Sequence, residues 1–420
     1  MMGRCLRRFL VGRTIVFCGL PCAWLASWSR RFRLLLRGAD HRFSWSASRD
    51  LFRCCSFARG RLAGFRTQSG IAPGRWQTTN NDGLPHELPI RRAKWHWALW
   101  LFAAVLTSCG GYSDFTLPPL AGGDPTLTFT FEEHTVPVLT EPGQEALNPS
   151  VISGQPWLNF YSRFDGRTWH TAMATSADGI DWQRRGAILS PDARTWEGSY
   201  IAANGSALRE GGRWWYWYQA GPKASPRIGL LREGSLREPA PVLGFGPYMS
   251  WDERAVADPG VIRIEPYFYL YYLGQDRADP PRQRLGVARS RDGVHWEKLR
   301  TNPILSPSGP GAFDENGVGE PAVWQFHGFY WMLFTGRASN EQRRLGLARS
   351  TDGVHWRKLP RVFAGSQAWD SQVICDPSVM VDGEQIRVWF GGGDLAKPDE
   401  GLHGQIGYGI LRPVHATLAP

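Results

Sequence analysis

The sequence predicts an all-β protein, a five-bladed β-propeller of four-stranded antiparallel blades, preceded by a signal and lipobox segment. The stretch "RLGVARSRDGVHWEKL" at 284–299 returns as "RLGLARSTDGVHWRKL" at 344–359 with three changes. An aromatic strand-like run and, before it, a short polar motif precede each copy, and this order recurs along residues 126–411. Repeats made only of short strands close radially, which favours a propeller over a solenoid.

The first 89 of the 420 residues differ in character from the rest of the chain. Residues 1–108 carry 18 Lys and Arg against 4 Asp and Glu, whereas the remainder carries 30 against 34. Since the main body lacks polybasic character, we expect no nucleic-acid partner. We expect residues 1–89 to be disordered or to result from an over-extended gene start.

Residues 90–109, "IRRAKWHWALWLFAAVLTSC", resemble a lipoprotein signal peptide. A basic start is followed by an apolar run, Trp97 to Leu106, of about signal-peptide length. The run ends in Leu-Thr-Ser-Cys, which resembles a bacterial lipobox, so we expect Cys109 to carry lipid and to hold the protein in the cell envelope, on the outer membrane. The alternative is an ordinary membrane anchor or a buried apolar helix, although the run is short for a bilayer span. Residues 110–125 then suggest a tether to a domain over 126–420.

Each repeat contains an apolar strand with a glycine, then an Asp-Gly pair, then Trp. An Asp-Gly pair between two strand-like runs is a strong hairpin signal. Full copies have their turns at Asp178, Asp292 and Asp352, and shortened copies lie at 228–234 and 405–411. We expect Trp182, Trp296 and Trp356 to pack between blades. Only one of the seven cysteines, Cys375, lies after residue 109, so the domain is not a disulfide scaffold.

Five aromatic runs supply the strand that precedes each copy of this repeat. The stretch "TLTFTFEEH" at 126–134 supplies the outer strand missing from the fifth blade. The five runs are 157–162, 214–221, 268–274, 330–336 and 386–393. Before each run lies the polar motif. Its first residues, which we call the axial residues, are Asn148, Asn204, Asp258, Glu320 and Asp376.

The axial residues open the strand that lines the central channel of a propeller, so five polar side chains should face one axis. Carboxylates crowded together raise one another's pKa, and paired carboxylates carry out glycoside hydrolysis. We therefore expect Asp258, Glu320 and Asp376 to be catalytic and the two asparagines to bind substrate. Capping of strand starts is the alternative role for all five, and it is favoured for the asparagines.

These blades, the acid-Pro motif and the repeated S-x-D-G-x-x-W resemble the five-bladed propeller glycosidases, the arabinanase, levansucrase and invertase-like superfamily with glycoside hydrolase families 43 and 32. The resemblance implies hydrolysis or transfer of furanosides or related sugars. It places Glu320 as the acid and Asp258 as the tuning residue. The base position holds Asn204, and an amide cannot take a proton. Either Asp376 replaces the base, or the protein binds carbohydrate without cleaving it.

Aromatic-acid pairs precede the axial acids by seven residues. Trp251 with Asp252 and Trp369 with Asp370 are expected either to form a sugar platform or to pack at blade edges. We expect no cofactor, because no cluster has metal-ligand spacing; a channel-bound calcium, present in some of the glycosidases that the chain resembles, stays open. The expected partners are a carbohydrate and, through Cys109, a membrane, with the protein a monomer. A protein-interaction propeller of the WD type is disfavoured, since its signature residues are absent.

Overall fold

The computed structural model describes residues 111–416 except Ser235. The chain divides into Met1–Pro89 and Ile90–Pro420, and all described residues belong to the second part. The predictions for residues 1–89, for the signal segment and for Cys109 lie outside the described residues. Within the described part, no helix is both long and apolar enough to cross a membrane. Its single helical element named here is a short 3₁₀ turn, η4 (Ala368–Asp370).

The described strands form antiparallel four-stranded units, in which each strand pairs with the next. The first unit holds β3 (Glu145–Ile152), β4 (Trp157–Phe164), β5 (Trp169–Ser176) and β6 (Gln183–Leu189). The second holds β7 (Ile201–Glu210), β8 (Arg213–Gly221), β9 (Arg227–Arg232) and β10 (Leu236–Arg237). The third holds β11 (Ala255–Ile264), β12 (Tyr267–Gln275), β13 (Gln283–Ser290) and β14 (Glu297–Leu299).

The fourth and fifth units complete the series and join the two ends of the domain. The fourth holds β15 (Gly317–Phe326), β16 (Phe329–Arg337), β17 (Arg343–Ser350) and β18 (Arg357–Phe363). The fifth holds β19 (Val373–Asp382), β20 (Gln385–Gly393), β21 (Gln405–His415) and β2 (Leu127–Glu133). Leu127 pairs with His415 and Glu133 with Gly409, so the N-terminal strand supplies the outer strand of the last unit, as predicted.

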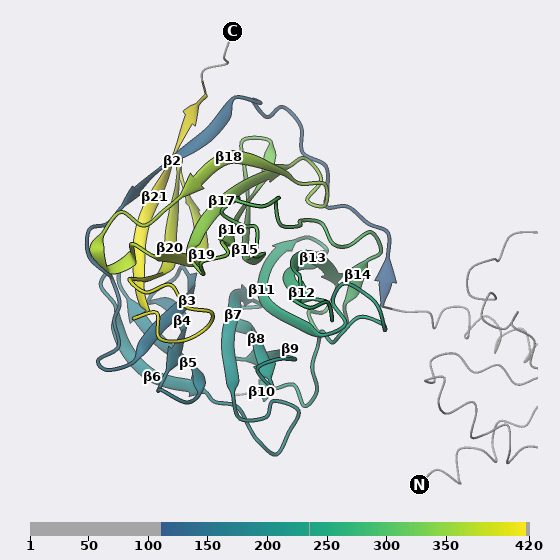
Figure 1. The fold of residues 1–420 in the computed structure, drawn as a ribbon, viewed down its shortest axis with the longest axis vertical. Coiled ribbons are helices and arrows are strands. Elements are labelled where there is room, and N and C mark those ends of the chain that lie inside the picture. Colours follow the sequence, from purple (N-terminus) through teal and green to yellow (C-terminus); the bar gives the residue numbers. More distant parts are fainter. Residues whose placement is uncertain (1–110, 235, 417–420) are drawn as a thin grey trace, which may run out of the picture. The chain divides into compact units, whose positions relative to one another are not determined.

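The first strands of the units surround the middle of the fold (Figure 1). β3 contacts β7, β7 contacts β11, β11 contacts β15, β15 contacts β19, and β19 contacts β3. Neighbouring units are also joined by short parallel pairings, such as Trp169 with Ile201 and Arg343 with Val373. This cyclic order of inner strands gives the propeller-like arrangement that the repeat predicted.

The repeated turns are fixed by their own motif and by an aromatic residue of another unit. In the third unit the Ser290 hydroxyl accepts the Gly293 amide at 2.9 Å, and the Asp292 carboxylate accepts the amides of Val294 and His295. The Gly293 carbonyl accepts the indole N–H of Trp217, from the second unit, at 2.8 Å. The Trp296 ring lies 6.3 Å from that of Trp217, which confirms the prediction that this tryptophan packs between units.

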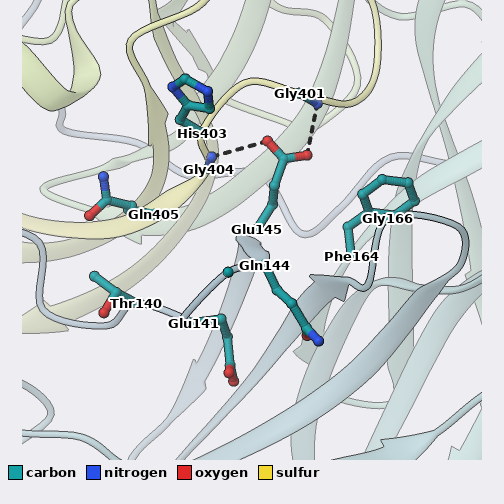
Figure 2. Close-up of a pocket in the computed structure, with 11 residues that line it drawn as sticks. Thr140, Glu141, Gln144, Glu145, Phe164, Gly166, Gly401, His403, Gly404 and Gln405 are labelled. Carbon is teal, nitrogen blue, oxygen red and sulfur yellow. Dashed lines mark hydrogen bonds between the residues drawn. The ribbon is translucent and has the colours of Figure 1, made fainter.

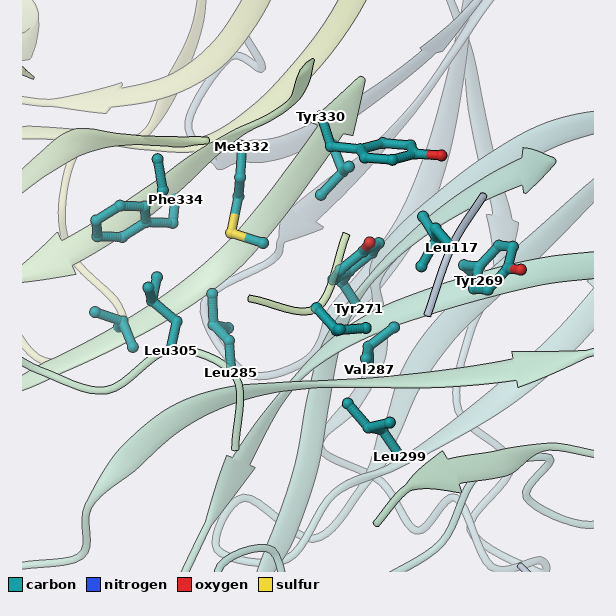
Figure 3. Close-up of a cluster of buried hydrophobic side chains, with 14 of the residues drawn as sticks. Leu117, Tyr269, Tyr271, Leu285, Val287, Leu299, Leu305, Tyr330, Met332 and Phe334 are labelled. Carbon is teal, nitrogen blue, oxygen red and sulfur yellow. The ribbon is translucent and has the colours of Figure 1, made fainter. Parts of the chain in front are cut away.

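The segment before β2 is packed against the domain, where we had expected a tether. β1 (Tyr112–Ser113) adds a parallel strand to β14 of the third unit. Leu117 is fully buried in the cluster between the third and fourth units, beside Tyr269 and Tyr330 (Figure 3). The prediction of a tether did not consider burial. Apolar residues spaced along a Pro/Gly-rich segment can each fill a gap in a preformed surface, and this burial stabilises the packed segment.

Candidate functional site

The five axial residues share one backbone conformation. Each lies fourth in the first strand of its unit, where the strand pairing shifts register, and not at the strand start as the sequence suggested. Their φ angles are positive, at 47° for Asn148, Asn204 and Asp258, 53° for Glu320 and 52° for Asp376. This left-handed bulge is costly for a side chain larger than that of glycine. The same strained φ angle occurs at the axial residue of every unit, and all five axial residues are polar. This indicates that the bulge directs these side chains toward one place.

Asp376 forms direct contacts with the axial residues on both sides. The Asn148 amide group donates to one carboxylate oxygen at 2.6 Å, and its backbone N–H donates to the other at 3.3 Å. The Cys375 thiol donates to that second oxygen at 3.1 Å. On the other side the Asp376 backbone N–H donates to the Glu320 carboxylate at 3.0 Å. One ligating atom from each of Glu320, Cys375 and Asp376 lies within 4.8 Å of the others.

Asn204 is held by the first unit and reaches the third. Its backbone N–H donates to the Ser162 hydroxyl at 2.9 Å, and that hydroxyl donates to the Asn204 side-chain oxygen at 2.8 Å. A further hydrogen bond joins the Asn204 side chain to Asp258. Asp258, Glu320 and both asparagines are partly exposed, while Asp376 is only 7% exposed. Hydrogen bonds therefore join Asn148, Asp376 and Glu320, and Asn204 lies beside Asp258, with Asp376 the most enclosed of the five axial residues.

The site favours protonated aspartates. Burial, and next the charge of Glu320, raise the pKa of Asp258 to about 8, against the opposing hydrogen bond from Asn204. Burial, the Glu320 charge and a hydrogen bond shared with the Glu320 carboxyl raise the pKa of Asp376 well above its ordinary value. Carboxyl groups with raised pKa values can hold a proton at neutral pH and deliver it.

Arg343 is a site residue that the sequence analysis missed. It is 8% exposed and is the first residue of β17. Burial alone would lower the pKa of its guanidinium, but the neighbouring Cys375, Glu320 and Asp376 raise it. The signal lay beside the almost identical repeats, because the residue that precedes them is Gln283 in one and Arg343 in the other.

The aromatic-acid pairs pack inside the units, which is the alternative to a sugar platform. Asp252 is fully buried and accepts the Lys298 ammonium at 2.5 Å. Trp251 packs against Tyr272, with ring centroids 5.4 Å apart. The Asp252 carboxylate is committed to structure, since a buried ion pair offers no group to a ligand.

The pairs of the fourth and fifth units also have a fully buried acid. Asp370 is fully buried at η4 and accepts the backbone N–H of Gln367 at 2.9 Å. Trp369 stacks on Phe390 at 5.9 Å. The fourth unit has a corresponding pair, Phe313 with Asp314, whose carboxylate is fully buried and accepts the Lys358 ammonium. Burial thus commits the carboxylates of Asp252 and Asp370 to packing, whereas substrate binding by the partly exposed Trp251 and Trp369 stays a prediction.

The cluster of Glu320, Cys375 and Asp376 offers few ligand atoms for a metal ion. Of the described residues, Glu320, Cys375 and Asp376 are the group whose ligating atoms converge. Calcium takes six to eight oxygen ligands, whereas this group offers two carboxylates and a thiol. These three side chains by themselves supply fewer oxygen ligands than calcium takes.

A pocket of about 440 Å³ lies between the first and fifth units (Figure 2). The Glu145 carboxylate, at the start of β3, accepts the backbone N–H groups of Gly401 at 2.9 Å and Gly404 at 3.2 Å there. Phe164 and His403 are further lining residues, and no axial residue lines the pocket. The pocket is thus separate from the carboxylate cluster, although the segment that forms its wall also reaches that cluster.

Part of the chain is similar in sequence to curated proteins. The chain is 30% identical to an uncharacterized protein of Mycobacterium tuberculosis over 161 residues, 36% of this chain and 52% of that protein. It is 27% identical over 125 residues to a 1,2-β-oligomannan phosphorylase of a Thermoanaerobacter species, covering 28% of this chain and 41% of that enzyme. The chain thus spans about half the length, or less, of these curated relatives.

Among solved structures, the fold is similar to a member of the GH130 family of mannoside phosphorylases, which contains glycoside hydrolases that target β-1,2-mannosidic linkages in Candida mannan. The TM-score is 0.53 at 15% identity, over 73% of this chain and 99% of that one. The model of the glycosyl hydrolases family 32 N-terminal domain matches residues 156–390, more than half of the chain. The chain therefore belongs to the glycosyl hydrolase family defined by that N-terminal domain.

Proposed function

We propose that the described domain is a closed five-bladed β-propeller and a glycoside-cleaving enzyme whose reaction takes place at the axial residues. The observation that carries the proposal is the convergence of Glu320 and Asp376, with Asp258 near enough for the Glu320 charge to raise its pKa. The same strained bulge places all three residues, and both aspartates have raised pKa values. A general acid in glycoside cleavage needs a raised pKa, and a charged partner nearby is one way to raise it.

The contacts limit which two carboxyl groups can act as a pair. One ligating oxygen of Glu320 lies within 4.8 Å of one of Asp376, which is closer than the 5–5.5 Å or 6.5–9.5 Å typical of retaining or inverting pairs. A sugar does not fit between two groups in contact. We therefore assign Glu320 and Asp376 to one side of the sugar, as a proton-sharing pair, and Asp258 to the other.

Hydrolysis is the first candidate reaction. Glu320 keeps the acid position that the resemblance gave it, and its contact with Asp376 supplies a proton reservoir. Asp258, which is partly exposed, would direct water when ionised. The substrate class is a furanoside or related glycan.

Phosphorolysis is the second candidate reaction, favoured by the amide at Asn204 where a base was expected. Phosphate is already an anion and attacks without a base, so one proton donor suffices. Since two of the compared proteins act on β-1,2-linked mannosides, that linkage joins the furanosides as a candidate substrate. Carbohydrate binding without cleavage is the remaining alternative.

The test is a substrate screen with the full chain. Fructofuranosides, arabinofuranosides and β-1,2-mannobiose are incubated with and without inorganic phosphate, and products are separated by chromatography. Free sugar without phosphate supports hydrolysis, and sugar 1-phosphate supports phosphorolysis. Saturable binding with no product in either condition overturns the enzyme proposal and supports a binding protein.

Anchoring at the cell envelope through Cys109 stays a proposal supported by the lipobox-like sequence alone. A lipid chain, and not the protein surface, would supply the membrane affinity. Cys109→Ser should move the protein from the detergent phase to the aqueous phase on partitioning, and an unchanged distribution would refute lipidation.

A further inference from the structure

The segment between β20 and β21, residues 394–404, bonds to three units other than its own. On the fourth unit, the Arg343 guanidinium donates to the carbonyls of Lys397 at 3.2 Å and Pro398 at 2.5 Å. On the first unit, Glu145 holds Gly401 and Gly404 as described above. Because these contacts lie on different units, the segment extends across the side of the fold at which the inner strands begin.

The tip of the segment is latched to the second unit. The Lys223 ammonium lies 2.9 Å from Glu400 and 3.1 Å from Asp399. The Tyr200 hydroxyl donates to the same Glu400 carboxylate at 2.5 Å. Lys223 and Asp399 are about half exposed, so the ion pairs are weak individually, worth about 1 kcal/mol or less.

Beneath the latch, the segment buries an apolar side chain beside the axial residues. Leu402 is fully buried in one cluster with Leu147, Ala203 and Cys375. These are the residues immediately before Asn148, Asn204 and Asp376. The segment therefore lies against the first-unit, second-unit and fifth-unit side of the site, where Asp376 is 7% exposed.

The third-unit side is left uncovered. No hydrogen bond or ion pair among the described residues joins the segment to the third unit, although the Asp399 charge is near enough to raise the pKa of Asp258, after burial and Glu320. A glycan lying across the whole mouth would collide with the segment, whereas a glycan entering from the third unit would not.

We propose that the 394–404 segment makes the axial site a dead end, so that only the end of a saccharide chain reaches Glu320 and Asp376. Glu400 and Lys223 set this restriction by holding the tip closed. The inference rests on the proposed glycoside cleavage for its substrate, but the cover itself is testable without any ligand.

The first experiment measures the accessibility of Cys375, which lies in the cluster that Leu402 closes. The full chain is treated with N-ethylmaleimide, and the Cys375 peptide is quantified by mass spectrometry, which separates it from the other six cysteines. Glu400→Gln and Lys223→Ala should label about fivefold faster than the natural protein, because each removes a latch worth up to about 1 kcal/mol. Arg412→Ala, the matched control, removes an ion pair to Glu132 on the outer strands and should not change the rate.

Equal labelling of Cys375 in the natural protein, the latch variants and the control would overturn the cover. Hydrogen exchange at Gly401 and Gly404 is measured in the same samples. Slow exchange in the natural protein supports the hydrogen bonds by which Glu145 fixes Gly401 and Gly404, and fast exchange contradicts them. Melting temperatures confirm that a faster rate does not come from unfolding.

The second experiment follows the products formed from linear oligosaccharides of the glycan that the substrate screen identifies. The natural protein should release one sugar or sugar phosphate at a time, and Glu400→Gln should add internal cleavage. Internal cleavage by the natural protein overturns the chain-end restriction and leaves the proposed function intact. If no glycan is cleaved, the proposed function fails and with it the chain-end restriction, while Cys375 labelling still decides whether the segment covers the site.

Discussion

Aspartate is used in two places of the repeat, and the two places push its ionisation in opposite directions. In the hairpin turns, backbone hydrogen bonds from Ile180 and Asp181 hold the pKa of Asp178 at about 2. At the axial bulges, burial and the Glu320 charge bring the pKa of Asp258 to about 8. A turn aspartate accepts N–H groups from its own chain, whereas an axial aspartate faces another carboxyl group from a neighbouring unit. Local donors stabilise the charged form, and convergence of acids in a buried place opposes it.

The comparison separates what repeats for the fold from what varies for chemistry. The turn keeps Asp in the three full copies, because the same backbone must be closed each time. The axial position keeps its backbone conformation but changes its side chain from Asn to Asp to Glu. Constant geometry with a varied side chain is the pattern of a scaffold that presents a site.

The largest expected effect comes from removing the charge that distinguishes the axial region. Glu320→Gln should lower turnover by about 10²- to 10⁴-fold, the range for loss of general acid catalysis, while ligand binding is kept. It should also lower the pKa of Asp258 and Asp376, because Glu320 raises both. Turnover and its pH profile are measured after the substrate is identified. Near-normal turnover would show that Asp258 or Asp376 donates the proton.

Asp258→Asn tests how the ionisation of an axial aspartate changes the free energy of unfolding with pH. The folded-state pKa lies near 8 and the unfolded value near 4, so the stability associated with the neutral group is full below pH 4 and is lost as pH rises toward 8. Asparagine does not ionise, so the variant should gain about 1–3 kcal/mol at pH 8 and nothing at pH 4. Urea unfolding at both pH values measures this. An equal gain at both would show that the carboxyl is not protonated in the folded protein.

Asp352→Ala tests the turn and should show the opposite pH dependence. Burial opposes the shift, but His355 and backbone N–H groups hold the pKa of Asp352 at about 2. The stability this gives is present above pH 4 and is lost as pH falls toward 2. The variant should lose about 1–2 kcal/mol at pH 7 and less at pH 3, with turnover unchanged. A loss of turnover without a loss of stability would move this turn into the functional region.

Among the axial variants, Asn204→Ala should have the smallest effect on turnover, within about threefold, because an amide takes no proton. Without the hydrogen bond that opposes the upward shift, the Asp258 pKa should rise further. The measurement is the pH profile of turnover, with Asn148→Ala as the matched amide variant. If Asn204→Asp creates activity that the natural protein lacks, the natural protein is a carbohydrate binder that has lost its base.

The sequence by itself determined the repeat, its order of strands and the five axial positions. Asp-Gly turns, alternating strands and their spacing are local properties, so a repeated motif such as 284–299 reports them directly. It also indicated that 126–134 would close the last unit, because that unit was one strand short. The part before residue 111, with Cys109, still rests on sequence alone.

Only the tertiary structure decided which side chains meet. The sequence left open whether Asp252 belongs to a sugar platform or packs at a blade edge, and the fold placed Lys298 against its carboxylate. Arg343 and Glu400 carry no motif, and they gain their roles from a segment that crosses from the fifth unit to the fourth and second. Ionisation follows the same rule: the high pKa of Asp258 depends on burial and on a carboxyl 62 residues away in the chain, and such long-range convergence has no local pattern to reveal it.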